Sequence, residues 1–133
     1  MLALSGPAQA ASPPAINRAE EIAYTVYPAV AQTCPQGVVI EEGPTVIPGA
    51  IAEAWPPPYC RVRFATLALS WDELCLATVH EFGHLAGLDH SVDPNDVMFE
   101  YGAHHPACGP TVEQVSEMRY TVRRPRHAAR RAC

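Results

Sequence analysis

The chain has 133 residues, a formal net charge of −5 at pH 7 and a hydrophobic content of 48%. This length suits one domain built around a single core. No run of about 18 apolar residues is present, which argues against a membrane-spanning helix.

The first sixteen residues carry no periodic apolar pattern. Met1 to Ala11 consists of apolar and small residues and includes Ala8-Gln9-Ala10, which fits a signal-peptide cleavage site. No basic residue precedes this site, and the apolar stretch is short. We interpret residues 1–16 as the remnant of a signal peptide or, alternatively, as a flexible N-terminus, and we predict a folded domain over residues 17–124.

The first predicted element is a helix that begins at Asn17. Asparagine is a favourable N-cap residue, and Glu20 stands three positions later, where a capping box places its acidic residue. Pro28 cannot continue a helix and is expected to end this one near Tyr27.

Short strands are expected next. Residues 38–40 form a short apolar run, and residues 45–47 form a second candidate between two Pro/Gly turns. Residues 50–55 are expected to be an extended edge segment that three prolines end. Polar and apolar residues alternate at 61–64, which predicts a half-buried strand that can extend to Leu69.

A longer helix is predicted over residues 71–88. Ser70 is its expected N-cap, and Glu73 stands at the capping-box position. One face of this helix is expected to pack in the core. The apolar residues of that face are Leu74, Leu76, Ala77, Leu85 and Leu88.

The C-terminal part is predicted to contain a last helix that begins at Thr111, with Gln114 as its capping signal, and ends before Pro125. Residues 125–133 form a basic tail with little apolar surface, which we predict is dispensable for folding. A basic tail can bind nucleic acid, but we prefer a solvated end that folds back on the acidic body. No nucleic-acid partner is therefore expected.

Five cysteines in so short a chain favour an oxidising compartment and a secreted or extracytoplasmic location. Four of them lie within the predicted domain, and these four allow three connectivities. We predict that Cys34 pairs with Cys60 and Cys75 with Cys108. Cys133 is expected to be free or to form an intermolecular bond.

The most informative motif is HEFGHLAGLDH at residues 80–90. His80 and His84 are four residues apart on the predicted helix, so their imidazoles share one face, and His90 follows after a glycine. Neutral imidazole is a good ligand for Zn²⁺, and catalytic zinc is held by three protein ligands with one open position. Glu81 is expected to point to that open position, where it can accept a proton from a metal-activated water.

The motif matches H-E-x-x-H-x-x-G-x-x-H at every fixed position and resembles the metzincin metallopeptidases. Thr78 to Ser91, TVHEFGHLAGLDHS, is similar to the matrixin branch because serine directly follows the third histidine. Residues 49–71 are similar, more weakly, to the matrixin edge strand, proline-bearing loop and last strand. The resemblance implies an α+β domain in which a short twisted mixed sheet packs on the active-site helix, with an N-terminal and a C-terminal helix. It also implies that substrate binds in extended form along the edge strand.

The resemblance also implies roles for residues around the ligands. Gly87 lies where the helix must stop, since glycine adopts a left-handed turn at little energetic cost. Met98 resembles the methionine that lies beneath the ligands in the family. Tyr101 is a candidate wall of the S1′ pocket, with an ordinary packed aromatic as the alternative.

Several features depart from the family pattern. Glu53 stands where a vertebrate-type matrixin places a histidine for a structural zinc, so we expect one zinc ion. Loops rich in Asp and Gly are absent from the sequence, which does not support calcium binding.

The sequence therefore predicts a zinc-dependent endopeptidase, a monomer that acts on protein or peptide substrates. One alternative is a non-catalytic zinc-stabilised binding module derived from a metzincin, and another is a metallohydrolase with a different substrate. The presence of Glu81 favours an enzyme over a binding module, because a purely structural zinc site has no use for that carboxylate.

Overall fold

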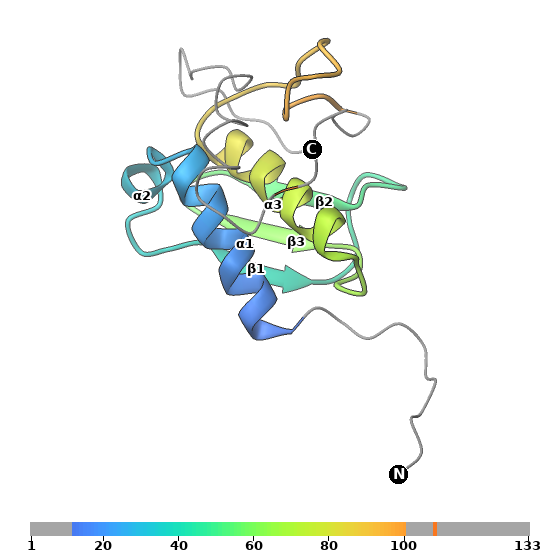
Figure 1. Cartoon of the computed structure of the whole chain (residues 1–133). Coiled ribbons are helices and arrows are strands. Elements are labelled where there is room, and N and C mark those ends of the chain that lie inside the picture. The colour runs from blue at the N-terminus through green and yellow to red at the C-terminus, as the bar shows by residue number, and fades with distance from the viewer. Residues whose placement is uncertain (1–11, 101–107, 109–133) are drawn as a thin grey trace, which may run out of the picture.

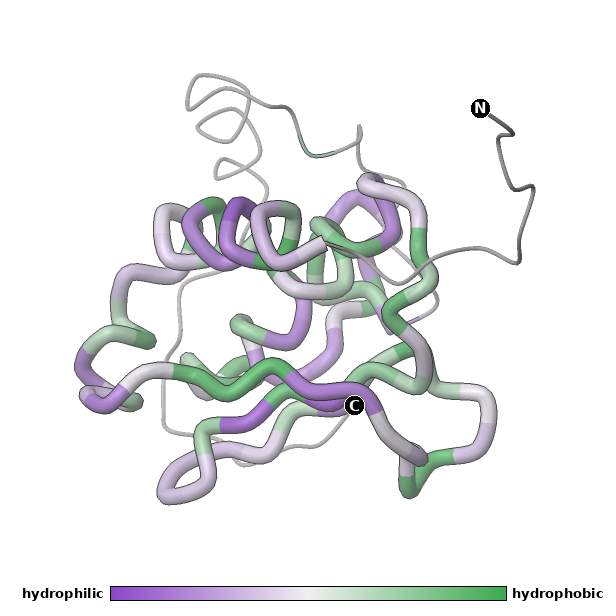
Figure 2. The backbone as a smooth tube through the Cα atoms, turned by 90° about the horizontal axis from the view of Figure 1, so that it is seen from below, coloured by the Kyte–Doolittle hydropathy of each residue, from purple (hydrophilic) through white to green (hydrophobic). Residues whose placement is uncertain are grey.

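The computed structural model describes residues 12–100 and residue 108. In this part of the chain the elements are α1 (Pro13–Val26), α2 (Val30–Thr33), β1 (Val39–Glu42), β2 (Ala52–Trp55), β3 (Arg61–Phe64) and α3 (Trp71–Leu85). Helices α1 and α3 lie side by side (Figure 1), and Figure 2 shows them as one layer with the strands as a second layer. This arrangement confirms the predicted α+β class. The predicted C-terminal helix and the basic tail lie outside the described residues.

Helix α1 begins earlier than the sequence suggested. Ser12 is its N-cap, and the Ser12 side chain accepts a hydrogen bond from the backbone N–H of Ala15. Pro13 and Pro14 occupy the first turn, where a backbone N–H has no helical acceptor and a proline is therefore tolerated. The predicted start at Asn17 was wrong because the two prolines initiate this helix instead of preceding it. Its predicted end is confirmed, since Tyr27 is the C-cap.

The three strands form a mixed sheet in the order β1-β3-β2. β1 is parallel to β3, β2 is antiparallel to β3, and β2 lies at an edge of the described sheet, as predicted. The register aligns Ala54 with Val62 on the buried side that faces the helices. On the opposite side the register aligns Glu53 with Arg63.

The strand limits differ from the predicted ones. β1 covers 39–42 instead of 38–40, and residues 45–47 form no strand because the Thr45 hydroxyl closes a turn by donating to the Ile47 carbonyl. β3 ends at Phe64 and does not extend to Leu69. Beyond this point the chain turns, and the backbone N–H of Leu67 donates to the Glu42 carboxylate at 2.6 Å.

Helix α3 has the predicted capping box. The Ser70 hydroxyl accepts from the Glu73 backbone N–H at 3.2 Å, and the Glu73 carboxylate accepts from the Ser70 N–H at 3.3 Å. The helix ends at Leu85, three residues before the predicted end. Gly87 causes this stop: its φ is +97°, and its N–H donates to the His84 carbonyl.

The core lies between the two long helices and the sheet. Its largest fully buried side chains include Phe64, Phe82, Leu74 and Leu85. The prediction for the apolar face of α3 holds for Leu74, Leu85 and Leu88. It holds only in part for Leu76 and Ala77, which pack against the core but are only partly buried and also line a surface cleft. No helix among the described residues is long and apolar enough to cross a membrane.

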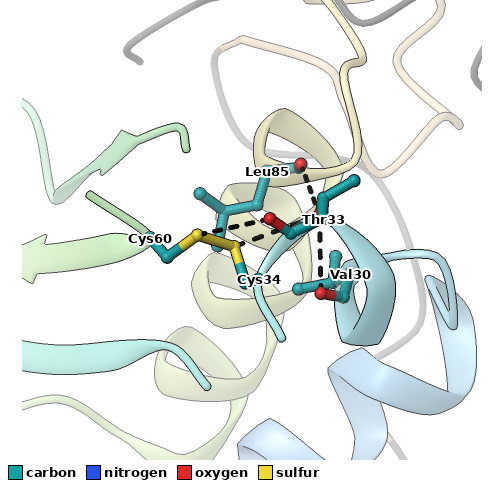
Figure 3. Close-up of a disulfide and its surroundings, with 5 residues drawn as sticks. All are labelled: Val30, Thr33, Cys34, Cys60 and Leu85. Carbon is teal, nitrogen blue, oxygen red and sulfur yellow. Dashed lines mark hydrogen bonds between the residues drawn. A yellow bond between two sulfur atoms is a disulfide. The ribbon is translucent and has the colours of Figure 1, made fainter. Parts of the chain in front are cut away.

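Two disulfides are present, and both predicted pairings are confirmed: Cys34–Cys60 and Cys75–Cys108. The first joins the end of α2 to the turn before β3 (Figure 3). Beside it, the Thr33 hydroxyl donates to the Leu85 carbonyl at 3.2 Å and so ties α2 to the end of α3. Cys133 lies outside the described residues.

Removing the Cys34–Cys60 disulfide is expected to lower the free energy of unfolding by about 3–4 kcal/mol. The two cysteines are 26 residues apart, and closing a loop of that length reduces the entropy of the unfolded chain by about this amount. Urea unfolding of the Cys34→Ala/Cys60→Ala variant measures the effect. The matched control is Cys133→Ala, which should leave the midpoint unchanged. A double variant with the wild-type midpoint would contradict the prediction.

Candidate metal centre

Three histidine side chains converge at the C-terminal end of α3. His80 and His84 project from successive turns of the helix, and the turn at Gly87 brings His90 back to them. The ligand atoms of the three residues all lie within 4.8 Å of one another, and the Nε2 atoms of His84 and His90 are 3.2 Å apart. The structure thus brings together all three residues that the motif singled out.

Backbone carbonyls fix which ring nitrogen of each helical histidine faces the cluster. The Nδ1 of His80 lies 2.8 Å from the Val97 carbonyl, and the Nδ1 of His84 lies 2.8 Å from the Leu88 carbonyl. A carbonyl can only accept, so both Nδ1 atoms carry the proton and the Nε2 lone pairs remain available. This hydrogen bond to the second nitrogen is the usual way in which a protein orients a ligating imidazole.

Burial keeps these two imidazoles neutral. It lowers the pKa of His80 to about 4, against a smaller opposing effect of the hydrogen bond to Val97. Burial, and then the nearby His80, lower the pKa of His84 to about 3. At neutral pH both rings are therefore in the form that binds a metal ion.

The donor set fits zinc. Zinc–nitrogen bonds of about 2.0–2.1 Å in a tetrahedral site place two ligand nitrogens roughly 3.3 Å apart. The distance between His84 and His90 is close to this value. Three lone pairs that face one another at such distances repel unless a cation lies among them, and neutral imidazoles suit a borderline cation such as Zn²⁺.

His80 and His90 line a cleft of about 560 Å³. Glu81 is buried yet lines this cleft together with His80 and His90. One wall is the segment 47–52, and α3 contributes Glu73, Leu76 and Ala77 to the lining. Val97, Phe99 and Glu100 complete the lining. The sequence did not reveal these walls, and Tyr101, the candidate S1′ wall, lies outside the described residues.

The comparison with family models agrees with this geometry. Residues 49–114 match the model of the matrixin family. The chain is a matrixin-like metzincin. The match covers about half of the 133 residues and only part of the domain, from the cleft wall through β2, β3 and α3 to the segment beyond Met98. A comparison with curated proteins found no match to the chain.

In this matrixin-like metzincin, Met98 packs against the turn of α3 that carries His80 and His84. Its side chain is fully buried, and a Cβ atom added to Gly83 would overlap the Met98 sulfur. Both backbone groups of Met98 are held by hydrogen bonds: the Asp96 carboxylate accepts from the Met98 N–H at 2.8 Å, and the Met98 carbonyl accepts from the Ser91 N–H. Glycine at position 83 therefore allows the close approach of Met98 to the helix.

Gly83→Ala is expected to destabilise the metzincin, although the same change in an exposed helix stabilises by about 1 kcal/mol. The added methyl would overlap Met98 and lie 3.3 Å from the Tyr27 ring, and both side chains are buried. Overpacking of this kind costs about 1–3 kcal/mol. Thermal unfolding should show a lower Tm.

The double variant Gly83→Ala/Met98→Ala provides the control. Shortening Met98 removes the overlap, so the two changes should be less than additive. A single Gly83→Ala variant with a raised Tm would show that this contact does not constrain the helix.

Proposed function

We propose that the chain is a zinc-dependent endopeptidase in which His80, His84 and His90 hold one Zn²⁺ and Glu81 is the general base. The observation that carries this proposal is the position of Glu81, whose side chain shares one solvent-accessible cleft with two of the three histidines. A zinc site with only a structural role has all four coordination positions filled by protein ligands, whereas a catalytic site keeps one position open. The match to the matrixin family supports a peptidase-related origin.

The reaction needs proton transfers that Glu81 is placed to perform. Bound zinc would supply Lewis-acid chemistry, which lowers the pKa of water and polarises a carbonyl group. The Glu81 carboxylate accepts a proton from the attacking water while the water oxygen adds to the peptide carbon. Glu81 then returns this proton to the amine nitrogen as the C–N bond breaks.

The edge of β2 suits an extended peptide. The Ile51 carbonyl accepts from the Ala65 N–H, so the backbone groups of residue 51 point toward β3. In an antiparallel pair these directions alternate, and the backbone groups of Ala52 therefore point away from β3. Ala52 also lines the cleft. A substrate strand that pairs with this edge would place an internal peptide bond beside Glu81.

We further propose an extracytoplasmic location and a single zinc per monomer. The two disulfides support the location, because disulfides persist in oxidising compartments. Among the described residues, the three histidines form the group of His, Cys, Asp and Glu side chains that could hold a metal ion, which supports one zinc.

A digestion assay tests the proposal. The zinc-loaded protein should cleave unfolded casein or gelatin at internal bonds, and 1,10-phenanthroline should stop the cleavage. Mass spectrometry of the fragments identifies the cleaved bonds and separates an endopeptidase from an enzyme that removes terminal residues. Protein that contains zinc and binds the substrate without cleaving it would instead indicate a binding module.

A further inference from the structure

Glu53 is a buried carboxylate in the middle of the edge strand β2, and its exposed fraction is 0%. Burying a carboxylate is unfavourable by several kcal/mol unless hydrogen bonds or an opposite charge compensate it. Its neighbours Ala52 and Ala54 face the helices, so Glu53 lies on the other side of the sheet, aligned with Arg63. The proposed reaction does not use Glu53.

The carboxylate holds a loop that forms a wall of the cleft. One oxygen, Oε1, accepts a hydrogen bond from the backbone N–H of Ile47 at 2.9 Å, and the other, Oε2, is buried without a hydrogen-bond partner. Ile47 is the first residue of the wall segment 47–52. The hydrogen bond therefore connects the edge strand directly to a segment that lines the cleft.

Side chains fasten the loop of residues 43–51 to the sheet between its two ends. At the ends, the backbone N–H of Gly43 donates to the Phe64 carbonyl, and the Ile51 carbonyl accepts from Ala65. Between these points the Glu53 carboxylate holds Ile47, and the Arg63 guanidinium donates to the Pro44 carbonyl at 3.3 Å.

The two side-chain contacts are unequal. The Arg63 contact with Pro44 is longer and exposed to solvent. The Glu53 contact is shorter, and its acceptor is a buried carboxylate, so it should be the stronger of the two.

The apolar side chains of the loop are only partly buried. Val46 is 74% exposed, and Ile47 and Ile51 are 40% and 52% exposed, so their burial alone holds the loop only weakly. Without a contact to the sheet, such a segment opens easily.

We propose that Glu53 is a positioning residue that fixes the loop of residues 43–51 as the wall of the cleft and thereby sets the affinity for an extended peptide. Glu53 acts through Ile47 and does not touch the reacting atoms. The part of this inference that concerns substrate affinity rests on the proposed peptidase function. The part that concerns the loop does not.

Hydrogen exchange at the Ile47 amide tests the loop in zinc-loaded protein. In the wild type this amide should exchange at least tenfold more slowly than an unstructured amide of the same sequence. Glu53→Leu, which keeps the bulk of the side chain and removes the acceptor, should bring its exchange close to the unstructured rate. Glu53→Gln keeps an acceptor oxygen and should retain most of the protection. An unprotected Ile47 amide in the wild type would overturn the inference, even if Glu53→Leu fails to fold.

Kinetics test the effect on substrate. Hydrogen bonds to charged groups contribute enough to change an equilibrium about tenfold or more when lost. Glu53→Leu should therefore raise KM for a fluorogenic peptide about tenfold and leave kcat within about twofold, and Glu53→Gln should restore KM to near the wild-type value. Zinc affinity should be the same in all three proteins. A fall in kcat and zinc affinity together, with KM unchanged, would show a merely structural role.

Failure of the proposed peptidase function and failure of the positioning role of Glu53 give different results. If the wild type cleaves no peptide but the Ile47 amide is protected through Glu53, the proposed function fails and the positioning of the loop stands. If the wild type cleaves peptides and Glu53→Leu leaves Ile47 protected, the positioning role is wrong and the peptidase assignment stands.

Discussion

Replacing Glu81 with alanine is expected to lower kcat/KM for peptide hydrolysis by about 10² to 10⁴-fold while zinc binding is retained. General acid–base assistance is worth about this factor, and Glu81 lines the cleft beside the histidines without belonging to the three-histidine group. Alanine is the best helix former, so α3 should keep its structure. Glu81→Gln preserves the size of the side chain but cannot take up the proton, so it should lower kcat/KM by a similar factor. Peptide kinetics and metal analysis of the same preparations measure both quantities.

His84→Ala provides the contrast. It removes one of the three converging nitrogens and leaves the buried Leu88 carbonyl without its Nδ1–H partner. Metal and activity should therefore be lost together, whereas Glu81→Ala should lose activity alone. Glu21→Ala on the exposed side of α1 is the control and should change neither. A wild-type protein that contains zinc, cleaves no unfolded protein and is indistinguishable from Glu81→Ala would defeat the assignment.

The three-histidine group could be predicted from the sequence because its geometry is local. His80 and His84 lie on one helix, whose repeat fixes their common direction. The capping box at Ser70 and the helix stop at Gly87 also depend only on residues close in sequence, and both are present in the structure. His90 then needs only the short turn after Gly87 to reach the other two.

The features that could not be predicted depend on contacts between distant segments. Helical periodicity marks Leu76 as apolar, but it cannot tell whether that part of the helix faces the core or a cleft. Pro13 and Pro14 can either precede a helix or occupy its first turn, and the choice depends on how α1 packs. No local pattern indicates that Ile47, a loop residue six positions away, donates a hydrogen bond to Glu53.

Gly83 illustrates the same limit within the motif itself. In the sequence it is an unfavourable residue in the middle of a helix. A glycine is needed at this position because Met98, fifteen residues later, packs against the helix there and leaves no room for a Cβ atom. A pattern shows that both residues are present, but only the fold shows that one requires the other.

Removal of the metal is expected to abolish hydrolysis and leave the protein folded. The core lies between α1, α3 and the sheet, and the two disulfides join segments outside the histidine cluster. Metal-free protein at pH 7.5 should therefore keep its circular dichroism spectrum and a cooperative thermal transition. If zinc binds only the folded state, a free zinc concentration of one thousand times its Kd should raise the free energy of unfolding by about 4 kcal/mol. Adding zinc back should restore both the higher Tm and the activity.

The metal-free protein should also lose stability in acid within a defined range. The folded pKa values of His80 and His84, about 4 and about 3, lie below the ordinary value of 6.5. The unfolded chain therefore takes up protons first as the pH falls, and stability decreases from about pH 6.5 until the folded pKa values are passed. Zinc affinity should fall over the same range, because protons compete for the imidazoles. Thermal unfolding of metal-free protein between pH 7.5 and 4 measures this slope. Metal-free protein that is already unfolded at pH 7.5 would show that the metal, and not the core with its disulfides, holds the fold together.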